Sequence, residues 1–111
     1  MEQVQQLLDD REVTPAAPIM LAGAALEELL RSLVLTHGVT VAGRPGLSAY
    51  SEALRAAEVL TRQDVKEITA WAGLRNAAAH GEFNELTRQG AALMAQGINN
   101  FMRAKTPVTA P

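Results

Sequence analysis

The amino-acid sequence predicts an all-α protein, a bundle of four or five helices arranged up and down. Apolar residues recur at intervals of three and four positions along most of the chain, which is the spacing of one helix face. Glycines and prolines separate these segments, and the strand-like piece at residues 39–41 is too short to build a sheet. The 111 residues fit one domain, which we place at residues 1–105, followed by a disordered tail at residues 106–111.

The first two helices are separated by prolines. A first helix is expected over residues 2–12, ending before Pro15, with an inward face of Val4, Leu7 and Leu8. A second is expected over residues 18–37, because Pro18 suits the first helical position and Gly38 suits a stop. Its wide apolar arc predicts a central, largely buried helix whose solvated edge consists of Glu27, Glu28 and Arg31.

A glycine-rich loop precedes the third helix. Residues 38–46 lack the spacing of the known phosphate-binding glycine loops, so we interpret them as a connector. Ser48 is expected to cap the third helix, whose inward residues are Tyr50, Leu54 and Ala57.

The last two helices also carry capping signals. Thr61 and Asp64 form a capping-box pattern that opens a fourth helix ending at Gly81. Asn84 is expected to cap a fifth helix running to Lys105. The residues expected at helical spacing along its buried side are Leu86, Gly90, Leu93, Gly97, Ile98 and Phe101.

Composition excludes several functions. The chain has no cysteine and only two widely separated histidines, so we expect neither a metal nor another cofactor. A net charge of -2 argues against tight, non-specific binding of nucleic acid by a monomer, although it leaves room for a local basic cleft.

The start of the chain and its most apolar stretch predict a cytoplasmic protein that does not bind membranes. Residues 1–3 lack the basic start of a signal peptide, and no signal-like apolar run follows. The apolar stretch at residues 19–35 is interrupted by Glu27, Glu28 and Arg31, which would be costly inside a bilayer.

Arg75 lies in an unexpected place on the fourth helix. At about 100° per residue it falls within the apolar stripe of that helix, formed by Val65, Ile68, Ala72 and Ala79. A guanidinium there needs a buried acceptor, a wet cleft or an anionic ligand. The structural alternative to a functional role is pairing with Glu27, Glu28 or another carboxylate, or hydrogen bonding to helix-end carbonyls.

The opposite side of the fourth helix is also apolar, with Ala70, Leu74 and Ala77. We therefore expect packing partners on two faces, the second being another helix of the bundle or a second subunit. We predict a homodimer whose interface includes Ala77. Asn76 and His80 are four residues apart and share a face, so both can reach one cleft with Arg75.

Over residues 71–83, WAGLRNAAAHGEF, the chain resembles the helix-end segment of the HEPN superfamily. The hallmark of this family is an arginine followed after four to six residues by a histidine. The stretch from Arg75 and Asn76 to His80 matches the four-residue version, including the polar residue after the arginine. The resemblance implies a small helical bundle that often dimerises.

The resemblance also implies a chemistry, because HEPN ribonucleases act without a metal. His80 would be the general acid/base, Arg75 would stabilise charge building on phosphate, and Asn76 would orient the phosphate or the imidazole. Attack of a ribose 2′-OH on the adjacent phosphate would leave a cyclic phosphate, with two copies of the motif facing across a dimer cleft.

Two functions follow as hypotheses. The first is a metal-independent endoribonuclease, an effector of the toxin–antitoxin or phage-defence kind, with RNA as substrate and a cognate antitoxin as partner. The second is a catalytically silent HEPN-like dimerisation or nucleotide-binding module that assists a partner enzyme. The first requires positive potential around the motif, whereas the second tolerates Glu82 and Glu85 there. We place the ribonuclease first because Arg75, Asn76 and His80 are all present.

Overall fold

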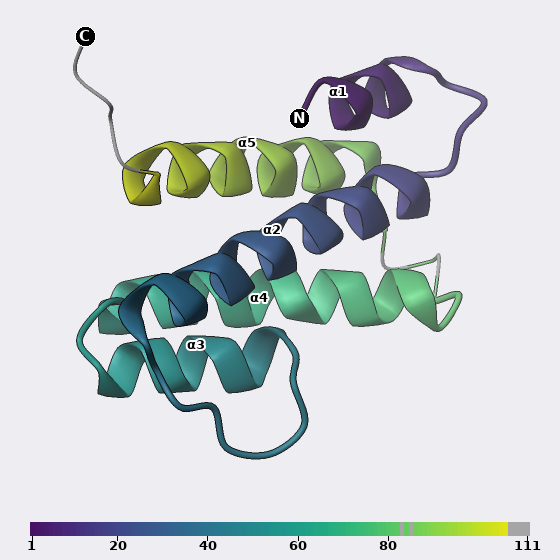
Figure 1. The fold of residues 1–111 in the computed structure, drawn as a ribbon. Coiled ribbons are helices and arrows are strands. Elements are labelled where there is room, and N and C mark those ends of the chain that lie inside the picture. The colour runs from purple at the N-terminus through teal and green to yellow at the C-terminus, as the bar shows by residue number, and fades with distance from the viewer. Residues whose placement is uncertain (83, 85, 107–111) are drawn as a thin grey trace, which may run out of the picture.

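The computed structural model describes residues 1–82, 84 and 86–106. Within these residues it contains five α-helices and no strand (Figure 1). The helices are α1 (Glu2–Asp9), α2 (Ala16–His37), α3 (Leu47–Ala56), α4 (Arg62–Ala79) and α5 (Arg88–Lys105). The predicted all-α bundle and its helix order are confirmed.

The helices form a flat, two-layered body of 42 × 39 × 20 Å. Its shortest dimension corresponds to two helix diameters. The central helix is α2, which packs against each of the other four and lies across α4 and α5 (Figure 1). Helix α3 packs on both α2 and α4, and α1 packs on α2 and α5.

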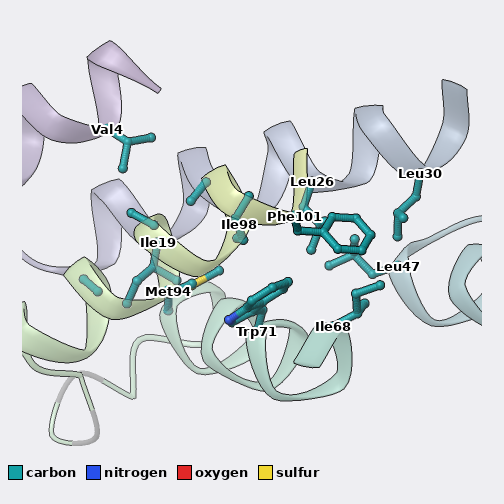
Figure 2. Close-up of a cluster of buried hydrophobic side chains, with 14 of the residues drawn as sticks. Val4, Ile19, Leu26, Leu30, Leu47, Ile68, Trp71, Met94, Ile98 and Phe101 are labelled. Carbon is teal, nitrogen blue, oxygen red and sulfur yellow. The ribbon is translucent and has the colours of Figure 1, made fainter. Parts of the chain in front are cut away.

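The core lies where α2 meets α4 and α5. Figure 2 shows side chains from all five helices in this region. Leu26, Leu30 and Ile98 are fully buried, and each such side chain contributes about 1.5–3 kcal/mol relative to exposure. Trp71 is also a core residue, with its ring edge-on to Phe101 at a centroid distance of 6.2 Å.

Helices α2 and α4 end in the same left-handed turn. Gly38 and Gly81 have φ values of 60° and 72°. After α4, the Gly81 N–H donates to the Ala78 carbonyl at 3.3 Å, and the Glu82 N–H donates to the Ala77 carbonyl at 2.9 Å. This Schellman motif satisfies carbonyls that the helix end leaves without partners, and it confirms Gly81 as the stop after α4.

Several predicted helix ends are wrong. Helix α1 ends at Asp9 instead of Glu12, because Asp10 is extended and its side chain accepts a hydrogen bond from the Glu12 N–H at 3.0 Å. Helix α2 begins at Ala16, two residues before Pro18. The first helical turn has no internal partners for its N–H groups, so a proline there sacrifices no hydrogen bond.

The predicted caps of α3 and α5 are also wrong. Gly46 is the N-cap of α3, and Ser48 lies inside the helix, where its carbonyl accepts from the Ser51 hydroxyl at 3.0 Å. Thr87, not Asn84, caps α5, because its hydroxyl accepts from the Gly90 N–H at 2.9 Å. Thr106 ends α5. The rest of the predicted tail, residues 107–111, lies outside the described residues.

The buried faces of three helices differ from the predicted ones. On α5 the buried residues are Ala91, Met94, Ala95, Ile98 and Phe101, whereas Leu93 is 62% exposed. Leu86, Ile98 and Phe101 are buried as predicted, whereas Gly90 and Gly97 are half-buried. Ala57 and Ala79 are exposed because they lie at the ends of α3 and α4. Within the described part of the chain, no helix has the length and apolar character needed to cross a membrane.

Candidate functional site

The helix that carries the motif begins with the predicted capping box. The Thr61 hydroxyl accepts from the Asp64 N–H at 3.1 Å, and the Asp64 carboxylate accepts from the Thr61 N–H at 2.9 Å. Lys105 of α5 pairs with the same carboxylate at 3.2 Å. Burial raises the pKa of Asp64, but the Thr61 hydrogen bonds and the Lys105 charge outweigh it, so the pKa lies below its ordinary value.

His80 and Asn76 lie at the other end of α4. The His80 N–H donates to the Asn76 carbonyl at 3.0 Å, and the turn at Gly81 follows directly. Both side chains are exposed. One helical turn separates them, so a ligand on that face can contact the amide and the imidazole together.

Arg75 is directed toward α2. Its Nη1 donates to Oε1 of Glu27 at 2.9 Å, and the two side chains are 27% and 41% exposed. This is the pairing with a carboxylate of α2 that was the structural alternative for Arg75. It crosses between helices, because Glu27 and Arg75 are 48 residues apart in sequence.

A glycine on α2 makes room for the arginine. A Cβ atom built on Gly23 would lie 2.5 Å from Cδ and 3.0 Å from Cγ of Arg75. Any larger residue at position 23 would therefore displace the stem of Arg75. The sequence reasoning missed this role of Gly23, because an isolated glycine in an apolar helix carries no signal of what packs on it.

The three motif residues do not form one hydrogen-bonded cluster in the described structure. Helices α2 and α4 run in opposite directions (Figure 1), and Glu27 lies one turn beyond Gly23 along α2. The Arg75 guanidinium therefore points toward the start of α4, whereas His80 lies at the end of α4. Asn76 and His80 share an exposed face, and Arg75 belongs to the interface with α2.

The charges close to the motif are mixed. Glu28 pairs with Arg31 at 2.7 Å, and the hydrogen bond from Arg31 lowers the pKa of Glu28 below its ordinary value. Glu82, two residues after His80, is exposed. Phe83 and Glu85, which the sequence also placed near the motif, lie outside the described residues.

The two apolar sides of α4 find their partners largely within the chain. Helix α2 packs on one side and α3 on another, and Ala77 is buried. The expectation that Ala77 belongs to a dimer interface is therefore wrong, because the chain itself covers this residue. Asn76 and Ala79, on either side of Ala77 along the same helix, are exposed.

Among the residues that the structure describes, no group of three or more His, Cys, Asp or Glu side chains is arranged to hold a metal ion. No protein-family profile matches the chain, and no curated protein or solved structure is significantly similar to it.

Proposed function

We propose that the chain is a metal-independent ribonuclease of the HEPN kind. The observation that carries this proposal is the exposure of His80 and Asn76 on one face at the end of α4, where Asn76 directly follows Arg75. An imidazole that solvent reaches can exchange protons with a substrate, and an adjacent amide can orient a phosphate. The all-α bundle is the fold that the resemblance implies.

The reaction requires no group beyond those of the chain, RNA and solvent water. A general base takes the proton of a ribose 2′-OH, the 2′-oxygen bonds to phosphorus, and the bond from phosphorus to the 5′-oxygen breaks. A general acid returns a proton to the 5′-oxygen, which leaves a 2′,3′-cyclic phosphate and a 5′-hydroxyl. His80 supplies one of the two proton transfers, solvent water supplies the other, and Arg75 stabilises charge on the phosphate oxygens.

A second candidate function is a silent dimerisation or nucleotide-binding module that assists a partner enzyme. The observation that favours it is the ion pair between Arg75 and Glu27, which already compensates the charge of the arginine. The exposed Glu82 adds negative charge close to His80 and would repel RNA.

Cleavage of a mixed RNA pool in EDTA by the wild type and by His80→Ala separates these functions. We expect the wild type to leave 2′,3′-cyclic phosphate ends and to fail on substrates with deoxyribose at the cut position. His80→Ala should be about 10²–10⁴-fold slower, the usual effect of losing an acid/base group.

His37→Ala is the matched control for this experiment. His37 is also exposed and also precedes a left-handed glycine at a helix end, but it belongs to α2. The His37→Ala variant should cleave RNA at the same rate as the wild type. Equal cleavage by all three proteins would point to a contaminant, and no cleavage by a folded wild type supplied with a native partner would favour the silent module.

A further inference from the structure

The stem and the charged head of Arg75 are held by different groups. The stem lies on the backbone of α2 at Gly23, where a Cβ atom would be 2.5 Å from Cδ of the arginine. Among the described residues, the head has a single hydrogen bond, from Nη1 to Oε1 of Glu27 at 2.9 Å. The packing at Gly23 can therefore keep the side chain in place when the guanidinium changes its partner.

The bond to Glu27 is of the kind that another anion can replace. A guanidinium has five N–H donors, and this ion pair uses one contact between two partly exposed side chains. Partly exposed pairs are weakened by solvent, which screens the attraction between the two charges. A phosphate accepts two parallel hydrogen bonds from arginine and binds it more strongly than one carboxylate oxygen does.

We propose that Glu27 occupies Arg75 in the free protein in place of a phosphodiester, and that RNA binds Arg75 by displacing this carboxylate. The inference rests on the proposed function, since it takes RNA as the ligand, and it describes how the same site is regulated. Glu27 is then an internal competitor that sets the affinity of the site. It is not a catalytic residue.

A competing Glu27 and a supporting Glu27 predict opposite effects on RNA binding when the carboxylate is removed. If Glu27 only held Arg75 in position, removing its charge would weaken RNA binding. If Glu27 competes with phosphate, removing its charge strengthens binding, while Gly23 still keeps the arginine in place.

Fluorescence anisotropy with a labelled ten-nucleotide 2′-O-methyl oligoribonucleotide tests the proposal without interference from cleavage, because this RNA lacks the attacking hydroxyl. Glu27→Gln should lower the Kd about two- to fivefold, which corresponds to a pair worth up to about 1 kcal/mol. Glutamine can still accept a hydrogen bond from Arg75, so the variant should remain folded.

Glu28→Gln is the matched control. Glu28 is the next residue on α2 and the substitution changes the net charge equally, but its partner is Arg31. At physiological salt, which screens exposed charges beyond about 8 Å, Glu28→Gln should change the Kd less than Glu27→Gln does. In an Arg75→Ala background, Glu27→Gln should give no gain beyond that of Glu28→Gln.

Three outcomes would overturn the proposal: weaker binding by Glu27→Gln, equal effects of the two glutamine variants, or no RNA binding by any of the proteins. The test distinguishes failure of this inference from failure of the ribonuclease proposal. Tighter binding by Glu27→Gln that depends on Arg75, in a protein that cleaves no RNA, supports the displacement of Glu27 and contradicts catalysis. Cleavage without that gain contradicts the displacement alone.

Discussion

Two helical glycines allow large side chains to lie directly on a neighbouring backbone. Gly23 of α2 receives the stem of Arg75, and Gly97 of α5 receives the ring of Trp71. A Cβ atom on Gly97 would lie 2.7 Å from Cζ2 of the indole. The indole is rigid and buried, so it has less freedom to move than an arginine stem.

We expect Gly97→Ala and Gly73→Ala to have opposite effects on stability. A Cβ atom added to Gly73 of α4 would have no neighbour within 4 Å, so alanine there should stabilise the fold by up to about 1 kcal/mol through helix propensity. At Gly97 the clash, typically about 1–3 kcal/mol, should outweigh that gain.

Urea denaturation of the two variants beside the wild type measures these free energies of unfolding. The variants should differ by about 2 kcal/mol. Equal stabilisation of both would mean that Trp71 does not pack on the α5 backbone.

At the scale of the helices, Asp64 joins the start of α4 to the end of α5. Its carboxylate accepts from the Thr61 N–H and pairs with Lys105, and these contacts lower its pKa despite partial burial. A lowered folded-state pKa means that the charged form stabilises the fold above the pKa of the unfolded chain, about 4. This contribution is lost as the pH falls through the folded-state pKa.

Asp64→Asn should therefore destabilise the protein more at pH 7 than at pH 3. Asparagine keeps a side-chain oxygen for the Thr61 N–H but loses the charge that faces Lys105. Urea melts of wild type and variant at both pH values give the two differences. A difference of the same size at pH 3 and pH 7 would contradict the role of the charge.

The helix pattern was predictable from local sequence, but the ends of the helices were less so. Thr61 and Asp64 form the predicted capping box, because both groups needed for it lie within one helical turn of each other. Ser48 and Asn84 failed as caps: Ser48 is the second residue of α3, behind the N-cap Gly46. At α5, Thr87 accepts the capping hydrogen bond instead.

Which carboxylate pairs with Arg75 is determined by how α2 and α4 pack against each other. Glu27 and Glu28 are adjacent on α2, and the sequence offered both. The packing of Arg75 on Gly23 selects Glu27, one turn further along, and leaves Glu28 to Arg31. The motif thus predicts which residues are candidates for the site, whereas their relative orientation required the tertiary structure.

At the scale of the whole molecule, the flat shape leaves a long solvent-facing line on α2. Met20 and Leu35 on this line are 41% and 68% exposed, and the Glu28–Arg31 pair lies between them. Two copies related by a twofold axis can each offer this same surface. We propose α2 as the centre of the homodimer in place of the buried Ala77.

Light scattering coupled to size exclusion at micromolar concentration should give twice the 11.8 kDa mass of one chain. The double variant Met20→Lys and Leu35→Lys should be a monomer. Leu93→Lys, at an exposed leucine of α5, is the control and should stay dimeric. A monomeric wild type would contradict the homodimer, and a dimeric double variant would exclude this surface.

Because the chain is synthesised from its N-terminus, the contact between the first residue of α5 and the end of α1 can form only late in synthesis. Arg88, the first residue of α5, donates to the carbonyls of Leu8 and Val13 at 2.7 and 2.6 Å, across 80 and 75 positions of sequence. An isolated eight-residue helix is unstable in water, and α1 packs on α2 and α5. The ribosome makes α1 before α5. Helix α1 therefore gains its contacts with α5, including those of Arg88, only after α5 has emerged.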